Sequence, residues 1–265
     1  MNEARKHAGR DTVLRTTGIT KLFGGLRAVD TFTMSVHEGE IHSLIGPNGA
    51  GKTTVFNVVT GIYRPEAGTV EFRNEDITGG KTHEIVKKGI ARTFQNIRLF
   101  NNMTCLENVM AGRHCRSKTS LAGSIFRTAG AREEEASILR ISEDRLEQVG
   151  LQGVRDELAR NISYGSQRML EIARALASGP ALLVLDEPSS GLNNRETEDL
   201  MGFIRRLIEE EHITILLIEH DVNLVMGISD WVTVMEEGKK IAEGTPEQIY
   251  HNPKVIEAYL GREEE

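Results

Sequence analysis

The segment Gly46–Thr53 constrains this chain more than any other part of its sequence, because it reads GPNGAGKT and matches the spacing G-x-x-x-x-G-K-[ST]. The apolar run Ile41–Ile45 precedes the segment and predicts a buried strand, and residues 53–59 after it predict a helix. A glycine-rich turn between a strand and a helix is typical of phosphate-binding loops. A glycine-rich turn that arises by chance would rarely have a strand directly before it and a helix directly after it. The sequence therefore predicts a phosphate-binding loop and, with it, a nucleotide ligand.

The predicted loop would hold phosphates mainly through its backbone. Gly46, Gly49 and Gly51 lack a Cβ, so the chain can turn tightly with its N–H groups pointing inward, and the helix N-terminus adds partial positive charge. Lys52 is expected to reach the β- and γ-phosphates of ATP, and Thr53 is expected to place its hydroxyl on Mg²⁺. The residues expected to contact the nucleotide in this segment are Gly46, Pro47, Asn48, Gly49, Ala50, Gly51, Lys52, Thr53 and Thr54.

Composition and charge narrow the class of protein. With 265 residues the chain is long enough for one large α/β domain, and its formal net charge of −7 argues against a nucleic-acid partner bound by bulk charge. The polar start, Met1–Lys6, does not resemble a signal peptide, and apolar runs such as Ile213–Ile218 are too short to span a bilayer. Any membrane association should therefore go through a partner. Cys105 and Cys115 have neither metal-site nor redox-motif spacing, so we expect reduced thiols in the cytoplasm.

Two kinds of apolar pattern predict two kinds of sheet. Val13–Val36 and Gly68–Phe72 contain alternating polar and apolar residues, which predicts an antiparallel sheet beside the nucleotide site. The runs Ala181–Leu185 and Ile213–Ile218 are almost continuously apolar, and a predicted helix, Glu196–Glu210, lies between them. Continuous apolar strands that alternate with helices indicate a parallel sheet covered on both faces.

The C-terminal part carries clear turn and cap signals. Residues 231–243 predict a hairpin that turns about Glu237-Gly238. Thr245 is expected to cap a following helix, with Pro246 at its first position and Gln248 closing a capping box.

Two segments farther upstream are expected to be helices with defined ends. Thr82–Lys88 predicts a short helix that Gly89 ends. Residues 139–149 place apolar or small side chains on one face of a second helix, which Gly150 should end. The residues of that face are Leu139, Ser142, Leu146 and Val149.

The block 102–150 carries helical signals and few strand signals, so it is interpreted as part of an insertion into the core. Within it, Arg113–Arg132 is basic, rich in small residues and poorly periodic, which predicts an exposed excursion. Glu133–Glu135 should open the next helix, because acidic side chains complement the positive end of its dipole.

A pair of carboxylates follows the predicted strand Leu182–Leu185, and together they resemble the Walker B element. Asp186 would lie at the C-terminal end of the strand, where parallel sheets bind ligands, and would hold Mg²⁺ directly or through water. Glu187 follows at once, and its carboxylate can orient or deprotonate an attacking water. A solvated acidic turn before Pro188 explains the pair equally well by itself. The phosphate-binding loop favours the hydrolytic interpretation.

Upstream of these carboxylates, Ile162–Ser166 reads ISYGS and resembles the LSGGQ signature of ABC ATPases, and the continuation QRMLEIARAL is close to the pattern of the same family. Ser163 and Gly165 would offer a hydroxyl and an N–H at the start of a helix, and such an N-terminus attracts a phosphate. The resemblance implies that this phosphate belongs to ATP held by a second subunit. Two subunits would then pair head to tail with two ATP molecules between them.

The chain departs from the family pattern at three positions. Tyr164 stands where Gly is usual, and Ser166 stands where Gln is usual, which removes one long polar side chain from the expected interface. Ser190–Asn193 matches the D-loop, with Asn193 where Asp is usual.

Three further elements of the pattern follow in the right order. Gln95 matches the Q-loop glutamine, which the resemblance implies touches Mg²⁺ and the attacking water. His220, just after the strand that ends at Ile218, matches the switch histidine that would contact the γ-phosphate, although a histidine after a strand is by itself commonly a surface residue. Phe23 matches the aromatic residue that stacks on adenine, and a core phenylalanine is the alternative. The other histidines show no ligand spacing and are interpreted as structural or solvated: His37, His42, His83, His114, His212 and His251.

The resemblance extends from about Leu14 to Gly261 and implies an α/β fold. This fold is a P-loop NTPase core of the RecA-like kind, with an antiparallel β subdomain and an inserted helical subdomain. The core and its β subdomain would comprise residues 11–94 and 178–265. The helical subdomain, which carries the signature, would comprise residues 95–177.

A finer resemblance connects the chain with the ATP-binding subunits of branched-chain amino acid importers. The run Gly89–Phe100 followed by Met103–Val109 looks like that subunit, and the excursion and the ending 244–261 agree with it. The resemblance implies a peripheral ATPase on the cytoplasmic face of the cell (inner) membrane, bound to integral-membrane permease subunits. A second ABC ATPase subunit, either another copy or a paralogue, would complete the dimer. We expect no nucleic-acid partner and no segment that spans the membrane.

Other interpretations stay open at this point. Asn96–Phe100 is the expected docking surface for a permease helix, and subdomain core is the alternative for Leu99 and Phe100. The chain could serve another transporter, for urea or for an exported lipid. A soluble ABC ATPase of DNA repair or translation is disfavoured by the acidic balance and by the lack of a long coiled coil and a second ATPase half. A small-molecule kinase would need the phosphate-binding loop but neither the signature nor the switch histidine.

Overall fold

The computed structural model describes residues 9–117 and 128–260, which form two sheets and a set of helices. The predictions for Met1–Lys6, for Gly261 and for the middle of the basic excursion concern residues outside these ranges. The strands are β1 (Thr12–Phe23), β2 (Leu26–His37), β3 (Ile41–Ile45), β4 (Ala67–Phe72), β5 (Glu75–Asp76), β6 (Ile90–Arg92), β7 (Leu182–Asp186), β8 (Thr214–Ile218), β9 (Trp231–Glu236) and β10 (Lys239–Gly244).

Helices follow most of these strands. The α-helices are α2 (Lys52–Val59), α3 (Thr82–Lys88), α4 (Cys105–Arg113), α6 (Ala129–Gln148), α7 (Tyr164–Ala177), α8 (Asn194–Glu211), α9 (Val222–Ile228), α10 (Pro246–Tyr250) and α11 (Pro253–Leu260). Single 3₁₀ turns are η1 (His114–Arg116), η2 (Gln152–Val154) and η3 (Ala159–Asn161). None of the described helices combines the length and the apolar character that crossing a membrane requires.

The larger sheet has six strands in the order β10-β9-β3-β8-β7-β6. β3 pairs in parallel with β8 and β9, β7 pairs in parallel with β6 and β8, and only β10 runs antiparallel to its neighbour β9. Every residue of β3, β7 and β8 is buried, as their continuous apolar runs predict. The C-terminal ends of these parallel strands therefore meet at one edge of the sheet, and the phosphate-binding loop follows β3 at that edge.

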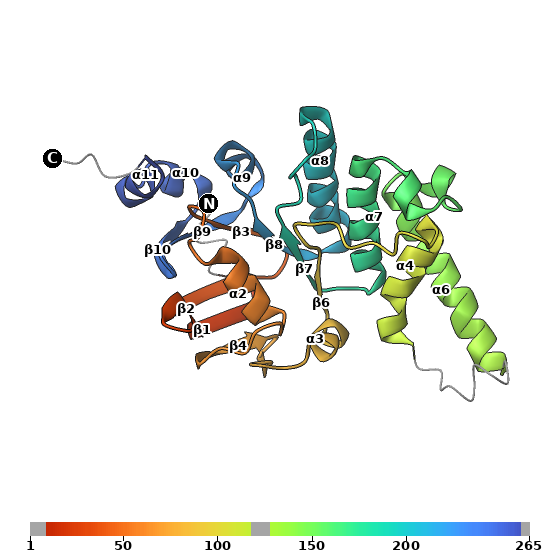
Figure 1. The fold of residues 1–265 in the computed structure, drawn as a ribbon, viewed down its shortest axis with the longest axis horizontal. Coiled ribbons are helices and arrows are strands. Elements are labelled where there is room, and N and C mark those ends of the chain that lie inside the picture. The colour runs from red at the N-terminus through yellow and green to blue at the C-terminus, as the bar shows by residue number, and fades with distance from the viewer. Residues whose placement is uncertain (1–8, 118–127, 261–265) are drawn as a thin grey trace.

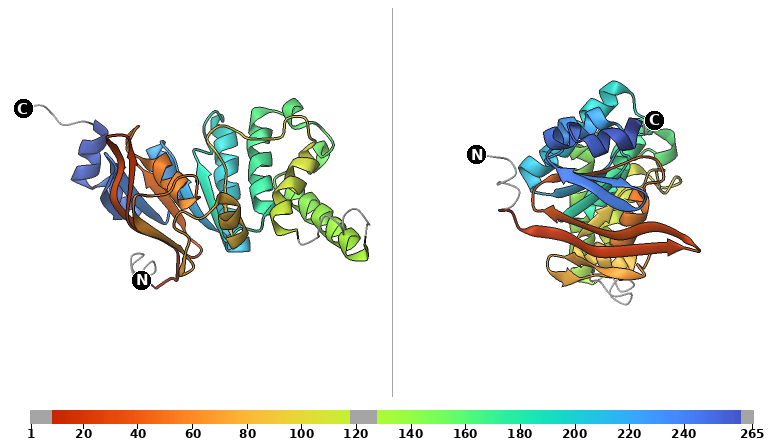
Figure 2. Two further views of the ribbon diagram at one scale, coloured as in Figure 1. Left: turned by 60° about the horizontal axis from the view of Figure 1, so that its bottom comes forward. Right: turned by 90° about the vertical axis from the view of Figure 1, so that its left-hand side faces the viewer.

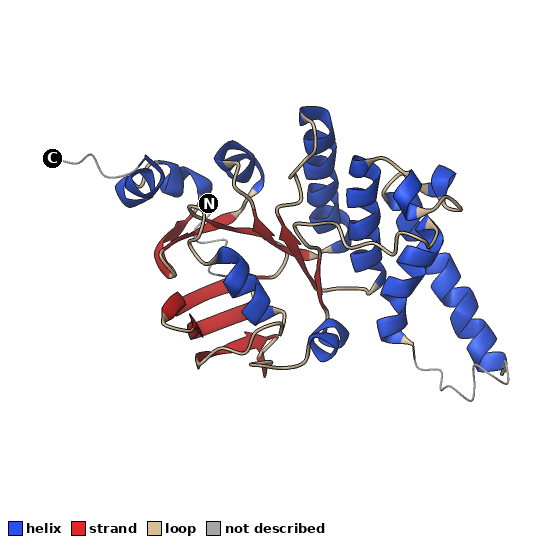
Figure 3. Ribbon diagram, in the orientation of Figure 1, coloured by secondary structure: helices blue, strands red, loops and turns tan. Residues whose placement is uncertain are grey.

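The smaller sheet is antiparallel, with the strand order β2-β1-β4-β5, which confirms the prediction from the alternating segments. Helix α2 lies between the two sheets (Figures 1 and 3). Its buried side chains Val55 and Phe56 belong to one apolar cluster with Phe32 of β2 and Leu44 of β3. This packing fixes the helix that begins at the end of the phosphate-binding loop.

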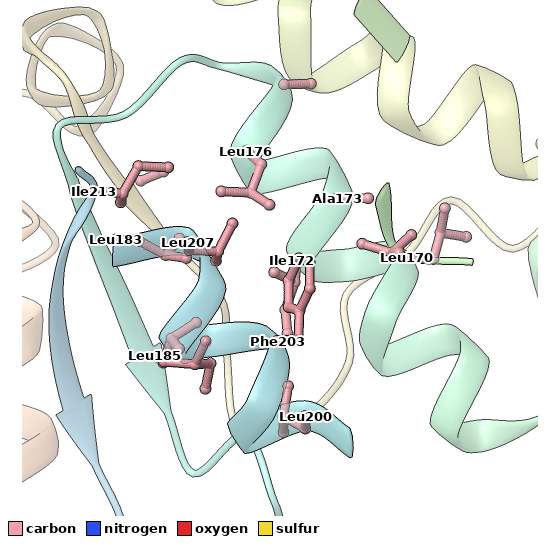
Figure 4. Close-up of a cluster of buried hydrophobic side chains, with 14 of the residues drawn as sticks. Leu170, Ile172, Ala173, Leu176, Leu183, Leu185, Leu200, Phe203, Leu207 and Ile213 are labelled. Carbon is pink, nitrogen blue, oxygen red and sulfur yellow. The ribbon is translucent and has the colours of Figure 1, made fainter. Parts of the chain in front are cut away.

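The other face of the larger sheet is covered by α8 and α9, and helices α4, α6 and α7 gather beyond its β6–β7 edge (Figures 1 and 2). A second apolar cluster joins these parts. Figure 4 shows Ile172 of α7 beside Phe203 of α8 and Leu176 of α7 near Leu207 of α8, with Leu183 and Leu185 of β7 close to α8. The helical block and the sheet thus share one continuous core.

The ends of several helices confirm their predicted signals. Gly89 ends α3 in the left-handed conformation with φ 118°. Thr245 caps α10 with a full capping box that includes Gln248 and with Pro246 at the first position. The β9–β10 hairpin turns at Glu237 and Gly238, both with positive φ.

The predicted start of α6 is wrong. The helix begins at Ala129, because the Thr128 hydroxyl caps it by accepting a hydrogen bond from the Ala131 N–H. Glu133–Glu135 therefore lie beyond the first turn, which holds no acidic residue, and they do not open the helix. Its C-terminal end agrees with the prediction, since the helix stops at Gln148 just before Gly150.

Candidate nucleotide-binding and hydrolytic site

The phosphate-binding loop needs its glycines for close backbone packing as well as for conformation. Gly46 has φ 150°, and a Cβ there would lie 2.0 Å from the Met235 carbonyl oxygen. Gly51 has φ 101°, and a Cβ there would lie 2.3 Å from the Ala28 carbonyl oxygen. Contacts this short with backbone atoms exclude any side chain. The loop is therefore wedged between β2 and the β9–β10 hairpin, and its shape is set before a ligand arrives.

Lys52 lies folded over this loop. Its ammonium group donates hydrogen bonds to the carbonyl oxygens of Gly46, at 2.6 Å, and Pro47, at 2.9 Å, and the residue is only 7% exposed. Burial lowers the pKa of Lys52, while the negative charges of Glu187 and Asp186 act in the opposite direction. The Lys52 ammonium group is thus held at the loop, close enough to Glu187 and Asp186 for their charges to act on it.

Asp186 ends β7, almost fully buried, and forms an ion pair that the sequence did not predict. Arg92, at the end of β6, donates from Nη2 to Asp186 Oδ2 at 2.7 Å, and the two side chains are only 6% and 4% exposed. The same guanidinium donates from Nη1 to Asn57 Oδ1 at 2.8 Å and to Thr60 Oγ1 at 3.1 Å. Arg92 therefore joins the C-terminal half of α2 to the carboxylate at the end of β7. The signal in the sequence was a lone arginine three residues before Gln95, on a strand that pairs with β7.

Glu187 has the left-handed backbone conformation, with φ 47°, which is costly for a residue with a long side chain. Its carboxylate is the meeting point of three predicted site residues. Gln95 Nε2 donates to Glu187 Oε2 at 2.9 Å, and His220 Nδ1 lies 3.8 Å from the same oxygen. The three side chains follow β6, β7 and β8, which are neighbours in the sheet, so their C-terminal ends bring them together. Parallel sheets bind ligands at this kind of edge.

The residues expected to hold Mg²⁺ are chemically suited to it. Thr53, Gln95 and Asp186 offer a hydroxyl, an amide and a carboxylate oxygen, which are ligands that Mg²⁺ prefers. No group of three or more His, Cys, Asp or Glu side chains forms a metal cage within residues 9–117 and 128–260.

The signature segment forms the N-terminus of α7. Ser163 caps the helix, because its Oγ accepts a hydrogen bond from the Ser166 N–H at 3.2 Å and lies 2.9 Å from the Ser166 hydroxyl. A Cβ at Gly165 would lie 2.5 Å from Glu196 Oε1, so the glycine allows α8 to pack closely. In Figure 1, α7 lies apart from α2, so the signature helix and the helix that follows the phosphate-binding loop are separate within this chain.

Tyr164, the unusual residue of the signature, has a partner within the same chain. Its hydroxyl donates to the Ser190 carbonyl oxygen at 3.2 Å, and its ring lies against Gly191, where a Cβ would approach to 2.8 Å. The Tyr164 side chain therefore connects the signature helix with the D-loop. Asn193 caps α8 with a full capping box that includes Glu196, so a structural role accounts for this residue.

Phe23 is exposed and does not belong to the core. It is 42% exposed at the end of β1, and its ring meets the ring of Tyr63 edge to face at a centroid distance of 5.2 Å. Lys21 Nζ lies 5.5 Å from the centre of the Phe23 ring. A partly exposed aromatic ring is able to stack on a flat base. The buried His42, by contrast, hydrogen-bonds Thr233 and contacts Glu40, as a structural histidine does.

Comparisons with known proteins find related sequences over most of this chain. The sequence profile of the ABC transporter family matches residues 29–190, and a profile described as branched-chain amino acid ATP-binding cassette transporter matches residues 239–265. The chain is 46% identical over 249 residues to the high-affinity branched-chain amino acid transport ATP-binding protein BraF of Pseudomonas aeruginosa, across 94% of this chain and 98% of the relative. The same identity and coverage relate it to LivG of Escherichia coli, described in the same words.

Two solved structures support the fold. One is an ATP-binding cassette of an ABC transporter in its ADP conformation, with a TM-score of 0.82 and 36% identity over 95% of this chain and 100% of that one. The other is a nucleotide-free ATP-binding cassette from an ABC transporter, with a TM-score of 0.83 and 34% identity at the same coverage. Both likenesses span the sheet, the phosphate-binding loop and the helical block.

Proposed function

Because the chain belongs to the ABC transporter family of ATP-binding proteins, we propose that it is the ATP-hydrolysing subunit of a membrane importer for branched-chain amino acids. The observation that carries the hydrolytic role is the meeting of Gln95, Glu187 and His220 at the sheet edge beside the phosphate-binding loop. The substrate class rests on the 46% identity to transport proteins for those amino acids, since none of the site residues faces a transported solute.

Glu187 would act as the general base. The Glu187 N–H donates a hydrogen bond to the Ile218 carbonyl oxygen at 2.9 Å. The end of β8 therefore fixes the backbone from which the Glu187 side chain extends. Gln95 already donates to its Oε2, and His220 Nδ1 lies 3.8 Å from the same oxygen. Lys52 would turn from the loop carbonyls to the β- and γ-phosphates, where an anionic oxygen is the better partner for an ammonium group. Activation of water and stabilisation of the developing phosphate charge then come from separate groups.

Thr53, Gln95 and Asp186 would hold Mg²⁺, which neutralises phosphate charge when it is bound. Arg92 pairs with Oδ2 of Asp186, so Oδ1 or a bridging water would make the contact to the ion. Phe23 would stack on the adenine, and the backbone of residues 46–54 would hold the phosphates.

A second ABC ATPase subunit would complete the site from outside. The capped N-terminus of α7, with Ser163 and Gly165, would bind the γ-phosphate of ATP held by the partner, which is a second copy or a paralogue. Removal of the γ-phosphate by hydrolysis then weakens the contact between the subunits. Residues 11–94 and 178–265 would form the nucleotide-binding core with its β subdomain, and residues 95–177 would form the helical subdomain that carries the signature.

The surface next to Gln95 would dock the permease on the cytoplasmic face of the membrane. Phe100 is 52% exposed, with the Arg174 guanidinium 5.7 Å from the centre of its ring. Leu99, by contrast, packs against the apolar core of the helical block. The partly buried Leu99 fixes the backbone beside Phe100. The exposed Phe100 ring and the nearby Arg174 cation could then contact the apolar and the polar face of an amphipathic helix.

Amino-acid uptake tests this proposal. In cells that lack the gene for this chain, the unaltered chain should restore uptake of radiolabelled leucine, isoleucine and valine, and Glu187→Gln should not restore it. Arg73→Met, a change at an exposed position far from the site, serves as a matched control and should restore uptake. Unchanged uptake of the three amino acids in the gene-deleted cells, with loss of urea uptake or of lipid export, would refute the assigned substrate class.

A further inference from the structure

Glu219 is a buried carboxylate at the hydrolytic site that neither the sequence pattern nor the proposed mechanism uses. It follows β8 directly, stands just before His220 and is 0% exposed. Charged side chains are rarely buried without a partner, because leaving water costs several kcal/mol per ion. Its position therefore calls for a physical reason.

One of its oxygens holds the turn that carries Glu187. Glu219 Oε1 accepts a hydrogen bond from the Ser189 N–H at 2.9 Å, two residues after Glu187. Burial raises the pKa of the Glu219 carboxyl, while hydrogen bonds from Ser189 and the nearby His220 act in the opposite direction.

The other oxygen is left for the histidine. Glu219 Oε2 is buried and accepts no hydrogen bond from any described residue, and the nearest basic nitrogen is His220 Nδ1 at 3.7 Å. A buried acceptor without a donor is unfavourable by roughly 1–3 kcal/mol, so a small movement of the ring that brings Nδ1–H onto it is favoured. The His220 side chain is 61% exposed and free to make this movement. Glu187 Oε2 lies at a similar distance of 3.8 Å, but it already accepts a hydrogen bond from Gln95 and its side chain is 20% exposed to water, so it gains less from a further donor than the buried Glu219 oxygen does.

We propose that Glu219 is a positioning residue, which accepts the Nδ1–H of His220 and so turns Nε2 toward the nucleotide. The inference rests on the proposed function for the nucleotide that Nε2 faces, but the contact between Glu219 and His220 is a property of the chain alone. A carboxylate behind an imidazole selects one tautomer and one ring orientation, which is the task of the aspartate in a serine-protease triad. Since the other oxygen of Glu219 holds the Ser189 N–H, one carboxyl group fixes both the histidine and the turn beneath the general base.

Glu219→Gln tests the contact with little change in shape. The amide oxygen can still accept from the Ser189 N–H, and the amide NH₂ then faces Nδ1, which forces that nitrogen to be an acceptor. The tautomer is read from long-range ¹H–¹⁵N spectra of the full-length chain labelled with ¹⁵N-histidine, with the His220 signals assigned by their loss in His220→Gln. The unaltered chain should show the Nδ1–H tautomer, and Glu219→Gln should show the Nε2–H tautomer. ATP turnover by Glu219→Gln should fall by about 10- to 100-fold with little change in KM. A loss of this size is typical when the hydrogen-bond partner that orients a functional histidine is removed.

Glu40→Gln is the matched control, because Glu40 is equally buried and lies 3.1 Å from His42 at the opposite edge of the sheet. It should leave the His220 signals and the turnover unchanged. Glu219→Asp keeps the carboxylate and should keep the Nδ1–H tautomer, which provides a second variant if the amide impairs folding.

An Nε2–H tautomer in the unaltered chain would overturn the inference, whatever the variants do. Reduced turnover in Glu219→Gln with an unchanged His220 tautomer would also overturn it, since the residue would then act only through the turn. Normal turnover in His220→Gln would instead remove His220 from the proposed hydrolytic mechanism, and the tautomer result would still stand.

Discussion

The buried ion pair between Arg92 and Asp186 gives the sharpest energetic prediction of the structure. Arg92→Met removes the guanidinium but keeps an unbranched side chain of similar length. The change leaves Asp186 as a buried carboxylate without its cation, and it also takes the donor from Asn57 and Thr60. Removing one partner of a buried pair costs about 3–5 kcal/mol, because the remaining charge is uncompensated. This is a large part of the total stability of about 5–15 kcal/mol that is typical of folded proteins.

Thermal unfolding of the nucleotide-free chain measures this cost. At about 2–4 °C per kcal/mol for a chain of this size, the midpoint of Arg92→Met should fall by on the order of 10 °C. Arg73→Met is the matched control, since Arg73 also lies over a phenylalanine ring but forms an exposed pair with Glu38 at 3.5 Å. An exposed pair contributes about 0–1 kcal/mol, so the control should lose only a few degrees.

A double variant separates the buried charge from other effects of the substitution. Asp186→Asn removes the charge that Arg92→Met leaves unpaired. The variant with both changes should therefore have a higher unfolding midpoint than the variant with Arg92→Met alone. Equal midpoints for Arg92→Met and Arg73→Met would refute the reasoning. A double variant that melts below Arg92→Met would refute it too, because the buried charge would then not be the source of the loss.

Four further predictions follow from the site and its surroundings. Glu187→Gln should lower ATP turnover by at least about 100-fold, because the general base is lost, and should accumulate an ATP-bound dimer on a sizing column; near-normal turnover would exclude Glu187 as the base. Lys52→Ala should weaken ATP binding by about 10- to 100-fold in a titration, since one charge-assisted hydrogen bond is removed, and unchanged affinity would contradict its role. Phe100→Asp should abolish capture of the permease by the folded chain, and undiminished capture would place the docking surface elsewhere. Burial opposes the charge of Glu211, but hydrogen bonds from Arg145 and Gln148 outweigh this effect and lower the pKa of Glu211. The stabilisation from this carboxylate is therefore fully present above the unfolded pKa of about 4.3 and is lost as the pH falls through the lower folded pKa. In urea unfolding, Glu211→Gln should lower the free energy of unfolding by about 0.5–1 kcal/mol at pH 7 and by less at pH 3, and equal losses at the two pH values would contradict this prediction.

The parts of the site that the sequence predicts depend on local spacing. The phosphate-binding loop occupies one turn between a strand and a helix, so Lys52 and its glycines are fixed by neighbours in the chain. Glu187 directly follows the apolar strand β7, and His220 comes two residues after the end of the apolar strand β8, so both were expected at the C-terminal edge of a parallel sheet. Gln95 was assigned from the family resemblance, since the short strand β6 before it was not predicted. Capping boxes, such as that of Thr245, are equally local.

The features that the sequence did not reveal depend on side chains that meet across the fold. Arg92 and Asp186 are 94 residues apart, and the pairing of β6 with β7 alone brings them together. The positive φ of Glu187 arises from the sharp turn after β7, and nothing in the residue type announces it. Tyr164 was a departure from the family pattern with no stated reason until its hydroxyl was found on the Ser190 carbonyl.

The acidic run Glu133–Glu135 does not mark the start of α6. Three consecutive glutamates suggested the start of α6, but a threonine hydroxyl is a direct partner for a free N–H, whereas an acidic side chain acts only through the weaker field of the helix. Thr128 therefore sets the start of the helix, and Glu133–Glu135 lie farther along it.

Purification of the tagged chain from its native membranes, with every bound protein identified, tests the central proposal most directly. We expect two integral-membrane permease subunits and a second ABC ATPase to be recovered with the chain. An amino acid-binding protein encoded beside them would complete the importer. Recovery of only ribosomal or nucleic-acid-binding proteins would contradict the transport function and leave only the ATPase chemistry standing.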